Sequence, residues 1–252
     1  METVQKGNQM NISLNRRQLL FGVAAAIVVD PQQAAAVEGA SFNEYAATYR
    51  DRGLGKTMVT RPGQTWQSIF GKRMDIAKML NRQNVQLEQG QVVIVPAENA
   101  TVESISPFAK QTDVQGKVLH ISMRKYAWGL YDNQRLLAWG PAIGGTPWNQ
   151  RLRRGFKTPS GTFKITEIAG PDRRSNKYPK EAALRGEGAP MPYYMRLTKD
   201  GVGIHARYLR GTHISHGCIG MFYGHAQWLN KNHARDKRME VVVESYGLPE
   251  YV

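Results

Sequence analysis

The sequence has a single cysteine, Cys218, among its 252 residues. A disulfide within the chain is therefore excluded, and the thiol is a buried core residue, an intermolecular partner or a reactive group. Acidic residues are also few, because 20 Asp and Glu stand against 34 Lys and Arg and leave a formal net charge of +14. Such a charge favours anionic partners, although it serves solubility equally well. No nucleic-acid-binding motif accompanies the scattered basic residues, so nucleic acid is not an expected partner.

The sequence also lacks an apolar run long enough for a comfortable membrane span. Arg16 and Arg17 precede the shorter run LLFGVAAAIVV, and a small-residue stretch at 34–36 follows it. These are the parts of an export signal. The arginine pair resembles a twin-arginine signal, though ordinary secretory signals carry such pairs too. We expect residues 1–36 to be a signal peptide and the protein to be periplasmic; an uncleaved signal would leave a membrane anchor.

A small α+β unit is predicted between residues 56 and 97. A β-prone stretch at 57–60 leads into a turn, and Thr65 can cap a short helix whose apolar face is Trp66, Ile69 and Phe70. Asp75 can cap a second helix, and an apolar strand at 91–95 ends at Pro96. The flanking residues, 37–55 with a short helical stretch and 98–114 with Ser, Pro and Thr, are interpreted as connecting segments.

This unit resembles the LysM family in the stretches RPGQTWQSIF, LNRQN and LEQGQVVIVP. The resemblance implies binding to the N-acetylglucosamine-containing glycan strands of peptidoglycan or chitin. The alternative is a spacer domain without affinity for sugars.

From residue 115 to 246 the pattern favours many short strands. Only residues 225–231 are clearly helical, and 247–252 form a C-terminal tail. Short strands separated by turn residues predict a sandwich or a barrel. The expected strands lie at 117–122, 127–131, 136–139, 161–166, 195–198, 202–205 and 240–244.

The surroundings of Cys218 indicate cysteine chemistry. A thiol attacks as its thiolate and needs a histidine or a positive environment. His216 would share a face with Cys218 if the chain there were a strand, and His205 ends a strand that can lie beside it. Gly217 would let the amides of residues 217 and 218 hold an oxyanion. The alternative is a metal site of Cys218 with His205, His213 and His216, for which no carboxylate or second cysteine provides support.

Residues 115–245 resemble the catalytic domain of the L,D-transpeptidases, the YkuD family. The matching stretches, in the family's order, are KTPSGTFKI, APMPYYMRL, GIH and SHGCI. The resemblance implies a mostly β, YkuD-like sandwich, with Cys218 as the nucleophile and His205 as the histidine that activates it. It places His216, Gly217 and Ser215 in the site wall and oxyanion hole, and implies no cofactor and no metal. Tyr193 and Tyr194 line the approach or belong to the core.

Two features depart from the family's pattern. Gly220 stands two positions after the cysteine, where the family usually has arginine or asparagine. The segment between His205 and Ser215 is short, with nine residues, and begins with Ala206 rather than glycine or serine.

The resemblance implies a peptidoglycan L,D-transpeptidase that passes through a thioester on a tetrapeptide stem. Its partners would be stem peptides and glycan strands, with a stem amine or a lipoprotein lysine as acceptor, and we expect a monomer. Hydrolysis of the same bond, by an L,D-carboxypeptidase or endopeptidase, is one alternative. A catalytically inactive peptidoglycan-binding protein is the other.

Overall fold

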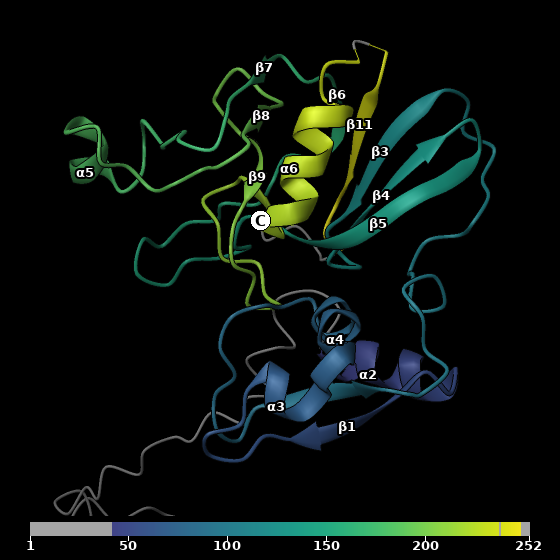
Figure 1. Ribbon diagram of the computed structural model, residues 1–252. Coiled ribbons are helices and arrows are strands. Elements are labelled where there is room, and N and C mark those ends of the chain that lie inside the picture. Colours follow the sequence, from purple (N-terminus) through teal and green to yellow (C-terminus); the bar gives the residue numbers. More distant parts are fainter. Residues whose placement is uncertain (1–41, 237, 248–252) are drawn as a thin grey trace, which may run out of the picture. The chain divides into compact units, whose positions relative to one another are not determined.

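A computed structural model of the protein describes residues 42–236 and 238–247 (Figure 1). The expected signal peptide at 1–36 lies outside these residues, as does all but the first residue of the expected C-terminal tail. Within the described ranges, no helix combines the length and the apolar character that crossing a bilayer requires.

The four elements expected between residues 57 and 96 are present. They are β1 (Gly55–Val59), α3 (Trp66–Phe70), α4 (Met74–Leu80) and β2 (Val92–Pro96). The two strands pair antiparallel, from Gly55 opposite Pro96 to Val59 opposite Val92.

The ends of the two helices show how local sequence sets this unit. Thr65 caps α3, since its hydroxyl accepts from the Ser68 N–H while the Ser68 hydroxyl accepts from the Thr65 N–H. The prediction that Asp75 caps α4 is wrong, because Asp75 lies in the first turn of that helix. The 3₁₀ turn Gly71–Arg73 joins the two helices, so that α4 already begins at Met74. Trp66 and Phe70 are buried as predicted, and their rings stack at 5.5 Å.

The two expected connecting segments are packed rather than loose. Residues 42–51 form helix α2 (Phe42–Asp51), and its buried Tyr49 donates a hydrogen bond to the carbonyl of Ile105 at 2.9 Å. Ile105 is fully buried and shares a hydrophobic cluster with Tyr49 and with Trp139 of the β-rich region. Burial of apolar side chains therefore anchors both segments.

The remaining strands form one sheet. They are β3 (Lys117–Ser122), β4 (Ala127–Asp132), β5 (Arg135–Ile143), β6 (Gly161–Phe163), β7 (Glu167–Ile168), β8 (Met195–Arg196), β9 (Gly203–Ala206), β10 (Ile219–Met221) and β11 (Glu240–Glu244). Their order is β6-β11-β3-β4-β5-β10-β9-β8-β7 (Figure 1). The mostly β character is confirmed, and the strands make one continuous curled sheet instead of the separate sheets of a sandwich.

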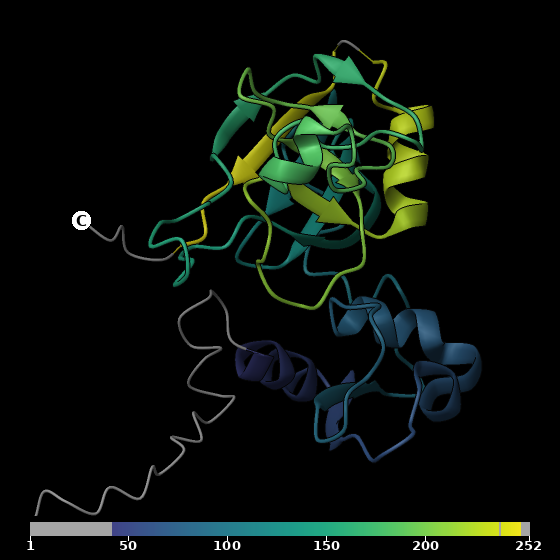
Figure 2. The same cartoon turned by 90° about the vertical axis from the view of Figure 1, so that its left-hand side faces the viewer.

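Helix α6 (Tyr223–Asn232) packs on this sheet, as Figure 2 shows. Its buried Ala226 and Leu229 join the main core cluster, to which β9 and β10 contribute Ile204 and Ile219. The short elements β7, β10 and α5 (Lys180–Leu184) were not predicted, since two to five residues carry too little periodicity.

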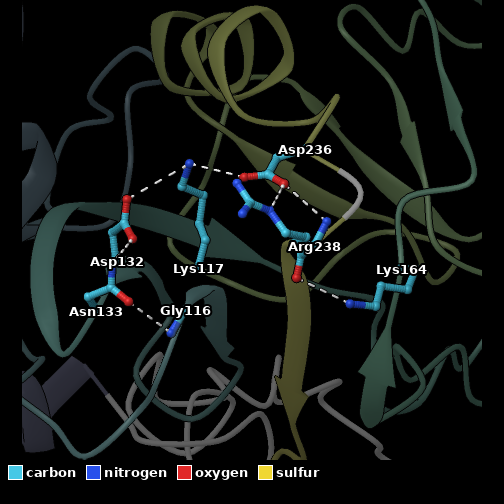
Figure 3. A network of polar contacts seen from close by, with 7 residues as sticks. All are labelled: Gly116, Lys117, Asp132, Asn133, Lys164, Asp236 and Arg238. Atoms are coloured by element: carbon cyan, nitrogen blue, oxygen red, sulfur yellow. Dashed lines mark hydrogen bonds and ion pairs between the residues drawn. The ribbon is translucent and has the colours of Figure 1, made fainter.

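A network of ion pairs and hydrogen bonds surrounds Lys117, the first residue of β3 (Figure 3). The ammonium of Lys117 lies 3.2 Å from a carboxylate oxygen of Asp236 and 3.9 Å from one of Asp132. Asp236 also accepts from the backbone N–H of Arg238 at 3.0 Å. The network thereby ties the β3–β4 hairpin to the chain that leads into β11.

Candidate active site

The site is built on two neighbouring parallel strands. In the pairing of β9 with β10, Gly220 lies opposite His205. Cys218 immediately precedes β10, so strand alternation points its side chain to the same side as position 220. The thiol and the imidazole therefore face the same side of the sheet from adjacent strands.

His205 is held as a neutral base. Its side chain is buried, and its Nδ1 lies 3.0 Å from the carbonyl oxygen of Ala206. A carbonyl oxygen only accepts, so Nδ1 carries the proton and Nε2 keeps its lone pair. Burial lowers the pKa of His205 to about 4, with a smaller contribution from the charge of Arg207, although the Ala206 bond opposes the shift.

Cys218 rests as a thiol. Its Sγ is partly exposed and lies 3.8 Å from the carbonyl oxygen of Gly201. Burial raises the pKa of Cys218 above its ordinary value and outweighs the Gly203 N–H and the charges of Arg207 and Lys177, which lower it. These shifts favour the uncharged form of both Cys218 and His205.

Residues 216 and 217 form a bend and not a strand, and Ser215 before them makes only an isolated β-bridge to Gly145. The Ser215 hydroxyl donates to the carbonyl of Cys218 and accepts the N–H of Gly217 at 3.1 Å. Gly217 has a φ of 115°, which only glycine adopts without strain. The expected strand alternation between His216 and Cys218 is thus wrong, and the Gly217 amide, expected in the oxyanion hole, is already bonded within the bend.

Two residues that the sequence analysis did not identify, Thr158 and Tyr246, hold the bend through hydrogen bonds to the backbone. The Thr158 hydroxyl donates to the carbonyl of Gly217 at 2.8 Å and accepts the N–H of Gly145 at 2.9 Å. The Tyr246 hydroxyl donates to the carbonyl of Gly145 at 2.7 Å and accepts the N–H of Thr158 at 3.1 Å. Thr158 lies inside the quoted stretch KTPSGTFKI, and this was the signal that could have identified it.

His216 and His213 take different places. His216 is exposed and stacks on Tyr178, with 4.4 Å between ring centroids, while the ring of Phe156 lies nearly perpendicular to it at a centroid distance of 4.6 Å. His213 is fully buried: its Nδ1 accepts the N–H of Gly144 at 2.8 Å, and its Nε2 donates to the carbonyl of Met123 at 3.0 Å. His213 therefore braces the loop before Ser215.

Because both ring nitrogens of His213 are used by the backbone, the four-ligand metal set that includes it is not assembled. Across the part of the chain that the structure describes, no group of three or more His, Cys, Asp or Glu side chains is placed to hold a metal ion. Tyr193 and Tyr194 are both buried in the core, and Tyr194 donates to the carbonyl of Gly201 at 2.9 Å.

A buried imidazole and a thiol on adjacent strands of a mostly β domain define a candidate cysteine acyl-transfer site. The model of the YkuD family, the L,D-transpeptidase catalytic domain, matches residues 116–243. This is a little more than half of the chain, and the chain belongs to this family. No curated protein matches the sequence.

Three solved structures of similar proteins share 15–21% of their sequence with this chain. An L,D-transpeptidase from Xylanimonas cellulosilytica has 15% identity and a TM-score of 0.48, with 74% of this chain and 98% of that chain covered. One from Stackebrandtia nassauensis has 19% identity and a TM-score of 0.45, with coverages of 68% and 77%. L,D-transpeptidase 1 of Mycobacterium tuberculosis has 21% identity and a TM-score of 0.37, with coverages of 51% and 61%. The family assignment rests on the family model alone.

Thr158→Val should loosen the bend beside Cys218 while keeping the side chain's volume. The change leaves the buried Gly217 carbonyl and Gly145 N–H without their partner, which costs about 1–3 kcal/mol of unfolding free energy. Alkylation of Cys218, followed by intact mass at a temperature where the variant is folded, should slow by about tenfold. The matched control is Thr162→Val, on an exposed position of β6. Equal rates in both variants would show that Thr158 does not position the thiol.

Proposed function

We propose that this protein is a peptidoglycan L,D-transpeptidase that acts through a thioester on Cys218. The observation that carries the proposal is the state of His205, whose Nδ1–H is committed to Ala206 and whose lone pair at Nε2 lies on the same side of the sheet as the thiol. Such a histidine can take the proton of an attacking thiol.

In the first half-reaction, Sγ of Cys218 attacks the carbonyl carbon of the third residue of a tetrapeptide stem. His205 takes the thiol proton and passes it to the departing amine of the fourth residue as the amide bond breaks. In the second half-reaction, the side-chain amine of another stem attacks the thioester. Its proton returns through His205 to the sulfur, and a 3→3 cross-link remains.

The oxyanion of each tetrahedral intermediate would be held by backbone donors. Since the Gly217 amide bonds to Ser215, we assign the Cys218 amide as the donor from this bend. Ser215 then has a positioning role, because its hydroxyl joins the Gly217 amide to the Cys218 carbonyl.

The unit formed by β1, α3, α4 and β2 would hold the enzyme on its polymer, in keeping with its resemblance to the LysM family. Binding of a glycan strand raises the local concentration of stems around Cys218. A net charge of +14 suits a polymer rich in carboxylates, and the N-terminal sequence favours a periplasmic location.

The first test is the intact mass of the protein after incubation with a carbapenem. The parent should gain one covalent adduct, because the strained lactam carbonyl accepts the thiol as the stem carbonyl does. Cys218→Ala should gain none, and His205→Ala should react at least about a hundredfold more slowly, since general-base transfer contributes about that factor. A folded parent without an adduct would contradict the proposed acyl-enzyme.

Product analysis then identifies the acceptor. Incubation with disaccharide tetrapeptides should yield cross-linked dimers whose mass equals two substrates minus one terminal residue. Shortened monomers alone would show that water is the acceptor and that the enzyme is a carboxypeptidase. A lipoprotein acceptor would instead appear as a protein of increased mass.

The pH dependence of acylation should reflect the neutral pair. Burial holds the pKa of His205 at about 4, so the imidazole stays unprotonated as the pH falls through the ordinary histidine range. We expect the rate of carbapenem acylation to fall to half near pH 4 and not near pH 6.5. Stopped-flow absorbance at 0.5-unit pH intervals, above the pH of acid unfolding, measures this; an acid limb near pH 6.5 would show that an exposed histidine acts as the base.

Glycan binding can be tested with the Cys218→Ala protein, which turns over no stems. It should sediment with purified sacculi, and N-acetylglucosamine oligomers should release it, whereas free stem peptides should not. Release by stem peptides alone would place the affinity in the catalytic site, and the β1–β2 unit would then be a spacer.

A further inference from the structure

The position of Gly220 raises the question of what occupies the space that a side chain would take. Gly220 is buried in β10, opposite His205 and on the side that Cys218 faces. A Cβ atom built on it would lie 2.2 Å from Cδ and 2.5 Å from Cγ of Arg207. Both distances are far inside van der Waals contact. The aliphatic stem of Arg207 therefore crosses directly over Gly220, and the glycine is required by that crossing.

The backbone places Arg207 for this crossing. Arg207 follows β9 by one residue, and its N–H donates to the carbonyl of Met221 at 2.9 Å. It stands two residues after His205, so alternation directs both side chains to the same side of the strand. The space that the family's arginine or asparagine would take on the cysteine's own strand is thus filled here by Arg207 of the neighbouring strand.

The charge of Arg207 acts on the reacting groups. Its field lowers the pKa of Cys218 and of His205, in each case as a smaller effect than burial, and it also lowers the pKa of the exposed His216. Arg207 itself is partly buried, and burial lowers its own pKa. The stem of Arg207 over Gly220, two residues from Cys218, places this charge on the side of the sheet that the thiol faces.

No carboxylate of residues 42–236 or 238–247 forms an ion pair with Arg207. Its charged neighbour is Arg210, which repels it. Together they line a cavity of about 510 Å³ whose other walls are Asn84, Val85, Gln86, Tyr208 and Ile214. A partly buried cation without a counter-ion is costly to a fold, so its retention favours a role in binding an external anion.

We propose that Arg207 is the carboxylate-binding residue of this site and takes the place of the side chain missing at Gly220. It holds a carboxylate of the ligand whose carbonyl Cys218 attacks. Naming that ligand as the donor stem peptide rests on the proposed function. The assignment of a carboxylate site beside the thiol does not.

The test compares two reagents that alkylate the same sulfur, iodoacetate with a carboxylate and iodoacetamide without one. Each forms a thioether and releases iodide, and Cys218 is the only thiol, so intact mass reports the rate directly. Arg207→Met keeps the aliphatic stem over Gly220 and removes the charge. It should lower the rate ratio of iodoacetate to iodoacetamide by about tenfold, the value of one charge-assisted hydrogen bond.

Arg207→Lys keeps a cation and should retain most of the ratio. Arg185→Gln removes the same charge at an exposed site that pairs with Glu187, and it should leave the ratio unchanged. An unchanged ratio in Arg207→Met, or an equal fall in Arg185→Gln, would overturn the proposal. Neither reagent requires a peptide, so a shifted ratio without a carbapenem adduct would remove the transpeptidase proposal and leave the carboxylate site.

A reciprocal exchange tests the crossing itself. Gly220→Arg alone should lower the melting temperature, because its Cβ collides with the stem of Arg207. Arg207→Gly combined with Gly220→Arg removes that collision and returns the charge from the cysteine's own strand. The double variant should recover the iodoacetate preference that Arg207→Gly loses, which is a non-additive result. If the losses of iodoacetate preference in the two single variants simply add in the double variant, Gly220→Arg does not replace Arg207. If the double variant does not fold, the rate ratios of Arg207→Met and Arg207→Lys decide whether Arg207 binds the carboxylate.

Discussion

The parallel pairing of β9 with β10 is the constraint on which the site depends. This pairing places His205 beside the strand that Cys218 precedes, although a loop separates the two residues in sequence. Parallel strands cannot be joined by a tight hairpin, so the residues between them must travel back along the sheet. They do so in the loop braced by His213, whose two ring nitrogens both bond to the backbone. The short segment after His205 is thus tied to the backbone at Gly144 and Met123.

Close backbone approach is the second condition for the site. Gly145 pairs with Ser215, and a Cβ on Gly145 would lie 1.7 Å from the carbonyl oxygen of Phe156. The Thr158 and Tyr246 hydroxyls use the resulting contact to fix the carbonyls of Gly145 and Gly217. A fully satisfied buried polar network of this kind holds a single geometry. Cys218 consequently follows a bend that the Thr158, Tyr246 and Ser215 hydroxyls hold in place.

Burial and charge act in opposite directions on the pKa of Cys218, whereas both lower the pKa of His205. Burial keeps both the thiol and the imidazole uncharged, since each charged form would lose solvation. The charges of Arg207 and Lys177 lower the pKa of Cys218 and so would stabilise a thiolate there. Neutral Cys218 and His205 therefore lie in the positive field of Arg207 and Lys177. Such a field would favour negative charge that develops on sulfur or on a bound oxygen.

Much of this arrangement could be predicted from the sequence. Periodicity and turn residues located most of the strands and both short helices near Trp66, because these features depend on local spacing. The lone cysteine, with its glycine and two histidines, indicated the chemistry, and the SHGCI stretch indicated the family. Strands of two or three residues were beyond that reasoning, as was the hydrogen bond from the Gly217 amide to Ser215, because it depends on the shape of the bend.

The sequence by itself determined which residues can react, because reactivity is a property of side-chain type and a single thiol leaves no choice. Only the tertiary structure showed how the three histidines differ, since both nitrogens of His213 are used by the backbone and His216 lies exposed on Tyr178. Only the tertiary structure, likewise, explained Gly220. The sequence shows only that position 220 lacks a side chain. In the structure Arg207 crosses that position from the neighbouring strand, and local sequence does not reveal which strands pair.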